Sequence, residues 1–454
     1  MKKFKEEQLK HHSRRLSIRE GLFASAKTSL SDHYIPPFAI AINSSNSVVS
    51  LIRGITGLLG PLSQLFGSKL VGKTSRKNIL MKSFIAETIL LLPLVIIAIL
   101  YQKNILTSTL PLILLLSFAL YTISAGIPYP AWFSWIGDLV DDKFRGRWFS
   151  KRTLLISFVS IVVAISASVF LDYFKKQNIT MLGFGIIFLL AALARFATIG
   201  DIKKSYEPKL KIKKENFFSF GDFLLKAPKN NFGKFAIFRT VLAFAGSISA
   251  PLLAVYLLRN LQFSYIHYMI ITFASTIYSL IVLEIWGKIS DKYGNYRIFV
   301  ITTILIPIIP ILWVIHPSLL YLLIIPPLIS GMSWAGFNLA ASNFIYDNVS
   351  KEKRGLAVSY YNLLVGIGVF LGAGLGALLI KILESTTAHA IIIIFFVGAF
   401  ARMVAVAWFL PKIKEVKKVK KSGSFRKIFM RELRPTIHEE FHEITSIGKY
   451  LREK

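Results

Sequence analysis

The chain has 454 residues, 54% of them hydrophobic and 17% charged, with a net charge of +31 and no cysteine. A soluble protein would be about one quarter charged and less apolar, so the composition argues against a soluble protein. The lack of cysteine excludes a disulfide framework and thiolate metal sites.

The hydrophobic residues gather in stretches about 20 residues long, the length that crosses about 30 Å of hydrocarbon. Examples of their apolar runs are residues 85–100, 154–171 and 391–400. A soluble helix would show a polar face in such a window, and these runs show none. They are predicted to be membrane-spanning helices.

The basic residues are distributed unevenly between the two sides of the predicted membrane. Most Lys and Arg lie in the tails and in the connections on one side of the predicted membrane. The connections on the other side contain only Lys103, Lys175, Lys176, Arg259 and Lys381. The basic segments are residues 1–19, 66–77, 143–152, 203–234, 288–297, 351–354 and 412–454. This asymmetry is the positive-inside signature, which predicts cytoplasmic termini and an even number of spans. Topology therefore explains the charge, and no nucleic-acid-binding motif accompanies it, so nucleic acid is not expected as a partner.

The first 19 residues are polar and basic, without the short apolar core and cleavage site of a signal peptide. After them, apolar runs alternate with charged breaks and predict twelve spans. The spans are expected near residues 20–42, 45–66, 79–101, 108–137, 149–171, 181–201, 235–258, 264–287, 296–315, 319–346, 356–380 and 389–410. Between the sixth and the seventh span, the piece FFSFGDFLLKAP is expected to lie on the membrane surface as an amphipathic segment.

These elements predict an all-α membrane protein built from twelve transmembrane helices in two six-helix bundles. The expected parts are a cytoplasmic tail 1–19, a first bundle 20–201, a central cytoplasmic linker 202–234, a second bundle 235–410 and a basic cytoplasmic tail 411–454.

Two polar loops recur in both halves, and internal repetition of this kind indicates a duplicated architecture. After the fourth span, Asp138 is followed seven residues later by Arg145-Gly146, and after the tenth span Asp347 is followed by Arg354-Gly355. The loop after the eighth span reads GKISDKYGNYR and contains Gly287, Asp291, Gly294 and Arg297. Its counterpart after the second span reads GSKLVGKTSRK and ends in Arg76-Lys77.

The pattern G-x-L-x-D-K-x-G-x-x-R resembles the signature loop of the major facilitator superfamily, and so does D-x6-R-G after spans four and ten. Residues 238–264 also look like the seventh span of poorly characterised prokaryotic members of that superfamily. The resemblance covers nearly the whole chain and implies a secondary transporter, in which two bundles rock about a site near the midplane of the membrane. Val71 and Thr74 replace the expected Asp and second Gly of the first loop. The motifs typical of drug–proton antiporters and of sugar porters are absent, so neither substrate class is carried over.

The repeated loops are hypothesised to form a cytoplasmic gate. A carboxylate at a helix N-terminus and a cation at a C-terminus interact with the helix dipole, and Arg–carboxylate pairs add geometric specificity. We expect Asp138 to pair with Arg145 or Arg76, Asp347 to pair with Arg354 or Arg297, and Asp291 to face a helix N-terminus. The alternative is that these residues only cap helices. The gate residues are Arg76, Lys77, Asp138, Arg145, Gly146, Gly287, Asp291, Gly294, Arg297, Asp347, Arg354 and Gly355.

Ionisable residues inside spans are costly in lipid and usually face a cavity or a partner. The resemblance implies that spans one, four, seven and ten line the central cavity. The candidates for cavity lining or coupling are Asp32, His33, Glu87, Arg239, Tyr129, Trp132, Trp135, Trp334 and Asn338. Proton coupling needs an acid or an imidazole, which favours Asp32, His33 and Glu87. The alternative is that these groups neutralise one another structurally. The spans contain other ionisable residues as well. Those others are Lys27, Arg53, Lys82, Arg195, Glu284 and Arg402.

Span eleven contains GIGVFLGAGLG, in which Gly366, Gly372 and Gly376 predict close helix packing. It is not a nucleotide-binding loop, because no strand precedes it and it lies in hydrocarbon. No cluster has metal-ligand spacing and no P-loop occurs. We therefore expect no catalytic residue, no metal and no cofactor, and the chain is not predicted to be an enzyme.

The favoured function is alternating-access transport of a small solute across the cell membrane, with proton coupling as an open alternative. The partners are then the solute, the lipid bilayer and, under coupling, protons, and the protein is expected to work as a monomer. The main rival is a non-transporting membrane receptor or assembly partner with the same fold. A membrane-embedded enzyme is a third class, for which the sequence offers no convergent set of acid, base or nucleophile.

Overall fold

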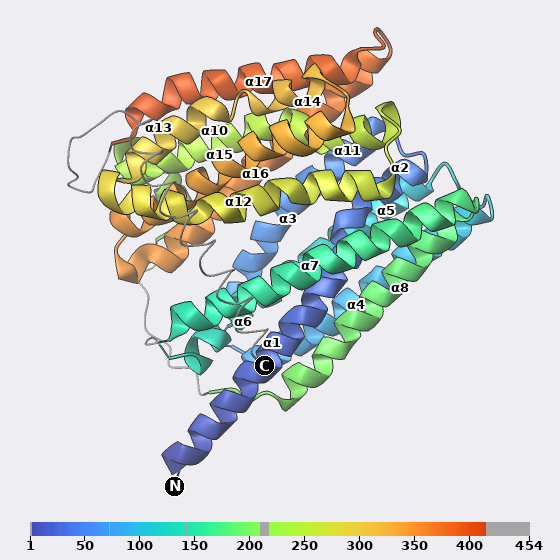
Figure 1. Cartoon of the computed structure of the whole chain (residues 1–454). Coiled ribbons are helices and arrows are strands. Elements are labelled where there is room, and N and C mark those ends of the chain that lie inside the picture. The colour runs from blue at the N-terminus through green and yellow to red at the C-terminus, as the bar shows by residue number, and fades with distance from the viewer. Residues whose placement is uncertain (1, 72, 142–143, 209–217, 415–454) are drawn as a thin grey trace, which may run out of the picture. The chain divides into compact units, whose positions relative to one another are not determined.

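The computed structural model describes residues 2–71, 73–141, 144–208 and 218–414, and these are almost entirely helical (Figure 1). Among these residues, 11 helical segments are long and apolar enough to cross a membrane. They are Asn46–Leu70, Arg76–Gln102, Leu110–Leu139, Arg147–Lys176, Thr180–Lys204, Asn231–Asn260, Tyr265–Ser290, Asn295–Ile315, Leu319–Asn348, Lys353–Glu384 and Ala390–Lys412. They correspond in order to the second through twelfth predicted spans. Most of the predicted tail 411–454 lies outside the described residues.

The first predicted span corresponds to three consecutive pieces of helix. Helix α1 (Lys2–Leu30) leads into the 3-10 turn η1 (Asp32–Tyr34) and then into α2 (Ile35–Ala41). The prolines in the first turn of α2 have no N–H to donate, so α1 cannot continue through them in regular α geometry. The charged residues of α1 lower its hydropathy, which is why composition alone does not mark it as a span.

The chain divides into two compact units. Unit 1 comprises residues 1–215, 243–270 and 359–398. Its complete membrane helices, besides α1 and α2, are α3 (Asn46–Leu70), α4 (Arg76–Gln102), α5 (Leu110–Gly126), α6 (Pro128–Leu139), α7 (Arg145–Lys176) and α8 (Thr180–Lys204). Figure 1 shows α4 and α8 running side by side, and α1 packs against both α7 and α8.

Unit 1 also contains parts of the second half of the sequence. These are the end of α10 (Asn231–Ser249), the 3-10 turn η3 (Ala250–Leu252), α11 (Leu253–Val255), the π-helical turn η4 (Tyr256–Asn260), the start of α12 (Tyr265–Tyr293), and parts of α16 (Lys351–Glu384) and α17 (Ala390–Phe409).

Unit 2 comprises residues 216–242, 271–358 and 399–454. Its complete described elements are α9 (Phe220–Lys226), η2 (Ala227–Lys229), α13 (Asn295–Leu305), α14 (Ile309–Ile315), α15 (Leu319–Asn348) and η5 (Leu410–Lys412). Helices α13 and α15 pack together around three rings: the centroid of Phe299 lies 5.3 Å from that of Phe235 and 5.7 Å from that of Phe344.

Prolines break two of the predicted spans. The fourth span is α5 followed by α6, with Pro128 in the first turn of α6. The ninth span is α13 followed by α14, and the break between them contains Pro307, with Pro310 in the first turn of α14. A proline inside a helix removes one backbone hydrogen bond and clashes with the preceding turn, so both spans bend where proline occurs. Each of these spans is therefore divided into two shorter helices.

Glycines on α16 allow two backbones to come close in unit 1. A Cβ at Gly372 would lie 2.1 Å from the carbonyl oxygen of Phe244, and one at Gly376 would lie 2.3 Å from that of Ile248. At Gly366 the Cβ would lie 2.2 Å from the carbonyl oxygen of Gly57 on α3. These are the three glycines that the sequence pattern assigns to helix packing.

The amphipathic piece expected between spans six and seven contains the short helix α9. Ser219 begins it with a capping box, in which the Asp222 amide donates to the Ser219 hydroxyl at 3.0 Å and the Ser219 amide donates to the Asp222 carboxylate at 3.2 Å. Its Phe223 is buried, whereas Leu225 is 76% exposed, and its location on the membrane surface stays a prediction.

Candidate functional site

A continuous series of charged side chains, joined in part by a tyrosine of α5, lies in unit 1 and comes from α1, η1, α4, α7 and α8. We call it the buried charge network. Glu20 and Lys27 are seven residues apart on α1, a spacing that places them on one face of the helix. The members are Glu20, Lys27, Asp32, Glu87, Tyr121, Arg152 and Arg195.

One end of the network centres on the Lys27 ammonium. Its Nζ donates to the Tyr121 hydroxyl at 2.6 Å, and that hydroxyl donates to Asp32 Oδ1 at 2.7 Å. Nζ also lies 3.5 Å from Glu87 Oε2 and 4.0 Å from Asp32 Oδ2. The Asp32 side chain is 37% exposed, whereas that of Lys27 is 7% exposed. Asp32 is therefore the accessible end of the series.

Glu87 lies at the centre of the network and its side chain is fully buried. Its Oε1 accepts a hydrogen bond from Arg195 Nη2 on α8 at 2.5 Å. The Arg195 guanidinium lies over the Phe84 ring, 3.4 Å from its centroid. Within the described part of the chain, Glu87 Oε2 accepts no hydrogen bond, although Lys27 is close to it. The carboxylate thus has one oxygen that is strongly bound and one that is available.

The other end of the network joins α1 to α7. Arg195 Nη1 lies 3.9 Å from Glu20 Oε1, and Arg152 Nη2 donates to Glu20 Oε2 at 3.3 Å. The Arg152 guanidinium lies over the Trp132 ring, 4.6 Å from its centroid, and its Nε donates to the Ser17 carbonyl. Trp132 therefore supports the network from α6.

The charges of the network balance, since Lys27, Arg152 and Arg195 oppose Glu20, Asp32 and Glu87. Charged groups that are removed from water need such partners, and deleting one partner of a buried pair typically costs about 3–5 kcal/mol because the other charge remains uncompensated. Any event that neutralises Glu87 therefore changes the balance for both cations beside it.

The remaining candidates on the first and fourth spans differ in exposure. His33 follows Asp32 in η1 and is half-buried. Tyr129 is 55% exposed and stacks on Phe133 of the same helix at 6.5 Å between centroids. Trp135 was expected to line the cavity, but it is 1% exposed and lies in a hydrophobic cluster, so it is a core residue.

In unit 2, Arg239 of α10 contacts aromatic rings of α15. Its guanidinium carbon lies 5.4 Å from the centroid of the Trp334 ring and 5.3 Å from that of Phe337. Asn338 follows Trp334 by four residues, which places both on one face of α15, and Asn338 is exposed. Cation–π contacts contribute about 0.5–2 kcal/mol, whereas an arginine at the centre of a bilayer costs at least about 2.5–3.5 kcal/mol. The two ring contacts therefore offset this cost only at the upper end of their range.

The first copy of the expected gate is built around Arg76, the first residue of α4. Arg76 is 1% exposed, and its Nη1 donates to Asp138 Oδ2 at 2.6 Å and to the Ser134 hydroxyl at 3.1 Å. Its Nη2 donates to the Pro208 carbonyl at 2.6 Å. Of the two partners expected for Asp138, the structure thus places Arg76 against it. The Arg145 side chain and the surroundings of Gly146 lie outside the description.

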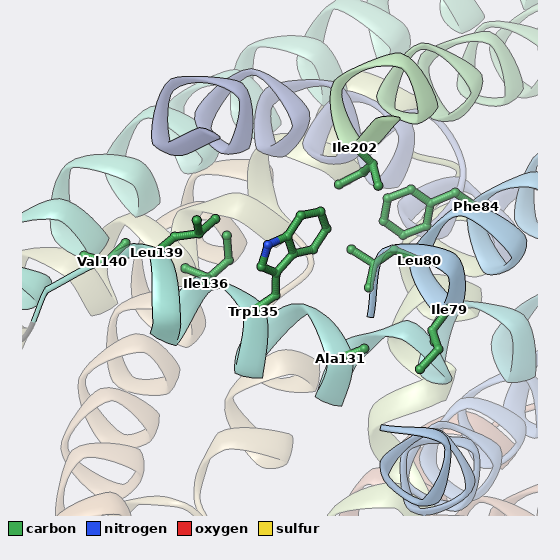
Figure 2. Close-up of a cluster of buried hydrophobic side chains, with 9 residues drawn as sticks. All are labelled: Ile79, Leu80, Phe84, Ala131, Trp135, Ile136, Leu139, Val140 and Ile202. Carbon is green, nitrogen blue, oxygen red and sulfur yellow. The ribbon is translucent and has the colours of Figure 1, made fainter. Parts of the chain in front are cut away.

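A hydrophobic cluster holds this ion pair in place. Figure 2 shows Trp135 between the α6 residues Ile136 and Leu139 and the α4 residues Leu80 and Phe84. The Trp135 indole N–H donates to the Tyr206 carbonyl at 2.9 Å. The start of the connection after α8 is therefore fixed to the same bundle as the ion pair.

Glu207 was not predicted, and it completes the first gate copy. The Arg76 amide donates to Glu207 Oε1 at 2.8 Å and the Ser75 hydroxyl donates to Glu207 Oε2 at 2.6 Å. A carboxylate at this place accepts from one of the free N–H groups at the start of α4 and interacts favourably with the positive end of the helix dipole. Lys77 donates to the Ser205 carbonyl at 3.0 Å. The sequence feature that could have pointed to Glu207 is the presence of an acidic residue in a mostly basic connection.

The second gate copy uses an amide where the first uses a guanidinium. Asn295 Nδ2 donates to Asp347 Oδ2 at 3.0 Å, and its Oδ1 accepts from the Ser290 hydroxyl at 2.7 Å. Arg354 Nη2 donates to the Val349 carbonyl at 3.0 Å, which is a helix-end contact.

Other residues of this copy are placed as follows. Gly294 has a φ of 85° between α12 and α13, a conformation that favours glycine. Arg297 lies over the Tyr293 ring at 5.7 Å. A Cβ at Gly287 would meet open space, Gly355 lies in the first turns of α16, and the Asp291 side chain is not described.

Several members of the buried charge network were missed as site residues. Lys27 and Arg195 were recognised only as ionisable residues in spans, and Glu20, Tyr121 and Arg152 were not singled out. The signal that pointed to them was the excess of cations in the apolar segments, because a buried cation requires a carboxylate close by. Among the described residues, no group of three or more His, Asp or Glu side chains could hold a metal ion.

Comparison with known proteins identifies the family. Residues 21–230 and 235–447 match the Major Facilitator Superfamily. No curated protein matches the sequence. Among similar solved structures, that of the nucleoside transporter NupG has 15% identity over 89% of this chain and 100% of that chain, with a TM-score of 0.61. A bacterial homologue of the iron transporter ferroportin in the inward-facing state has 14% identity over 88% and 98%, with a TM-score of 0.65.

A third similar structure is a POT family transporter in complex with 5-aminolevulinic acid, with 14% identity over 90% of this chain and 97% of that chain and a TM-score of 0.63. At these identities the likeness shows the fold, and it confirms the predicted all-α membrane architecture. The chain is an integral multi-pass membrane protein, and its family supports a role in membrane transport. The match across both halves establishes that the chain belongs to the Major Facilitator Superfamily.

Proposed function

We propose that the chain is a secondary active transporter that moves a small solute by alternating access and couples this movement to protons. Family membership supports transport, and the observation that carries the coupling is the position of Glu87 between Arg195 and Lys27. Intramembrane carboxylates of this kind commonly serve in proton relays.

The proposed relay begins at Asp32, which is the exposed end of the network. The Tyr121 hydroxyl joins Asp32 to Lys27, and Lys27 adjoins the available oxygen of Glu87. A proton on Glu87 removes the negative charge that holds the two cations, and Lys27 then has Asp32 and Tyr121 as its polar partners. Two protonation states thus have different contacts, and such a difference is what biases an equilibrium between conformations.

The same proposal gives the repeated loops the role of a cytoplasmic gate. The Arg76–Asp138 pair on one side and the Asn295–Asp347 contact on the other stabilise the cytoplasmic ends of their own bundles. We further propose that the protein works as a monomer with both termini in the cytoplasm, as the distribution of Lys and Arg predicts.

The test is transport by the purified protein in liposomes, measured for a panel of metabolites and drugs with and without a proton gradient. Glu87→Gln fixes the neutral state of the network, so solute exchange is expected to continue while gradient-driven accumulation is lost. Glu284→Gln is the matched control, because Glu284 is half exposed and pairs with Lys288 one turn away on α12. Gradient-driven accumulation by Glu87→Gln at the wild-type level would refute the coupling, and a complete lack of flux for every solute would favour the receptor function.

A further inference from the structure

Arg239 differs from the cations of the buried charge network. Lys27, Arg152 and Arg195 each lie within 4.0 Å of a carboxylate, whereas no carboxylate within ion-pair distance of Arg239 is found in the part of the chain that the structure describes. Arg239 is the ninth residue of α10, which places it about 12 Å along the helix from its start. It is therefore a guanidinium inside a membrane span whose described contacts are with rings.

The surface beside Arg239 is suited to water rather than to lipid. Asn338 is exposed and lies ten residues before the end of α15, about 15 Å along the helix. An amide exposed to hydrocarbon at this depth has no water to bond with, and such groups occur where they face a water-filled cavity or a partner. Because Trp334 and Asn338 share a face of α15 and Arg239 lies over Trp334, the three groups form one patch.

The chemistry of this patch selects one kind of ligand. A guanidinium presents a planar fork of N–H groups that matches a carboxylate with two parallel hydrogen bonds. The Asn338 amide supplies another donor, and the indole offers a flat apolar surface. A single cation balances the single charge of a carboxylate, whereas a phosphate carries about −1.5 to −2 at neutral pH.

We propose that Arg239, Trp334 and Asn338 form the subsite that binds the carboxylate end of the transported solute, which is an organic acid with a planar or apolar body. This assignment rests on the proposed transport function and adds the substrate class to it. Arg239 is the counter-charge of the solute, and Trp334 holds both the guanidinium and the body of the acid.

The first experiment measures binding without any gradient. The purified protein is unfolded thermally in detergent with benzoate, with its neutral analogue benzamide, with acetate or with inorganic phosphate at millimolar concentration. Benzoate is expected to raise the unfolding temperature more than acetate does, and benzamide is expected to leave it unchanged. Stabilisation by phosphate alone, equal stabilisation by benzamide, or stabilisation by none of the four overturns the proposal.

Variants test whether the patch carries this binding. Arg239→Gln is expected to weaken benzoate binding by more than about tenfold, as is usual when one partner of a buried charge pair is truncated, and Arg239→Lys is expected to weaken it less. Trp334→Phe reduces the advantage of benzoate over acetate while leaving acetate binding in place. Lys82→Gln, which removes an exposed cation from α4, is the matched control and retains wild-type affinity. Wild-type benzoate affinity in Arg239→Gln overturns the assignment.

Transport in liposomes then separates this inference from the function on which it rests. Benzoate binding that depends on Arg239, together with no flux of any solute, refutes the transporter but leaves the anion subsite standing. Flux of a carboxylate solute that is unchanged in Arg239→Gln refutes the subsite but leaves the transporter standing. If Arg239→Gln fails to fold, Asn338→Ala and Arg239→Lys give the same comparison with smaller changes.

Discussion

Glu87 of α4 accepts a hydrogen bond from Arg195 of α8 at 2.5 Å, while its second oxygen lies 3.5 Å from Lys27 of α1. One buried carboxylate thus joins three helices that are far apart in the sequence. A double-mutant cycle measures the strength of the shorter contact. Glu87→Gln and Arg195→Gln are each expected to lower the free energy of unfolding by about 3–5 kcal/mol.

The double variant Glu87→Gln with Arg195→Gln is expected to lose less stability than the sum of the two single losses. The difference, which is the coupling energy, is expected to be about 0.5–3 kcal/mol. The reason is that the second substitution removes the charge that the first left uncompensated. Unfolding in detergent at a series of denaturant concentrations provides the measurement. Additive effects would show that the two side chains do not stabilise each other.

The glycines of α16 provide a second prediction with a control on the same helix. Gly372→Ala places a Cβ 2.1 Å from the Phe244 carbonyl oxygen, so α16 and α10 must separate, and overpacking of this kind typically costs about 1–3 kcal/mol. Gly374→Ala meets open space and is expected to change stability by less than about 0.5 kcal/mol. Thermal unfolding of the two variants side by side is the measurement, and equal stabilities would contradict the close packing of the two helices.

The first gate copy predicts an asymmetry between the two members of its ion pair. Arg76 is buried and bonds to Asp138, Ser134 and Pro208, whereas the Asp138 side chain is 43% exposed. Arg76→Gln therefore removes several buried contacts and is expected to destabilise the protein by about 3 kcal/mol or more. Asp138→Asn keeps a hydrogen-bond acceptor in a partly solvated place and is expected to cost about 1 kcal/mol or less. A larger loss of stability for Asp138→Asn than for Arg76→Gln, measured by unfolding in detergent, would show that the buried contacts of Arg76 are not the main stabilising ones.

The start of α9 predicts a dependence on pH. Hydrogen bonds from the Ser219 hydroxyl and amide lower the pKa of the Asp222 carboxyl below its ordinary value. A lowered pKa in the folded state means that the stabilisation is present above the unfolded pKa of about 3.9 and is lost as the pH falls through the lower folded value. The protection of the α9 amides against hydrogen exchange, relative to the intrinsic exchange rate at each pH, is therefore expected to fall below about pH 4 in the wild type and to be low at every pH in Ser219→Ala. A profile without this acidic change would mean that the capping box contributes little.

The helices were largely predictable from the sequence because long apolar runs leave few alternatives to a membrane span. The repeated loops made the duplication visible. The interruptions at Ile127 and at residues 306–308 lie beside prolines, but proline alone does not fix their place, because Pro93 lies inside α4 and Pro326 and Pro327 lie inside α15. The low hydropathy of α1 comes from its many charged residues, among them Glu20 and Lys27, which the buried charge network requires.

The site was predictable only in part. Asp32 and Glu87 could be selected because carboxylates are costly in lipid. Their partners could not, since the pairing with Lys27 and Arg195 depends on which faces of α1, α4 and α8 meet. Trp135 shows the opposite error, because an aromatic residue on the fourth span has the same sequence signature whether it lines a cavity or packs in the core.

The four residues that follow α8 have a consequence for how the chain can be divided. The Tyr206 amide donates to the Ser13 hydroxyl, and the carbonyls of Ser205, Tyr206 and Pro208 accept from Lys77, Trp135 and Arg76. The N-terminal fragment of a two-piece version of the protein must therefore include Pro208, because ending it at Asp201 would leave Lys77, Trp135 and Arg76 without these acceptors. Co-expression of fragments split beyond this residue preserves every one of those bonds within a single polypeptide.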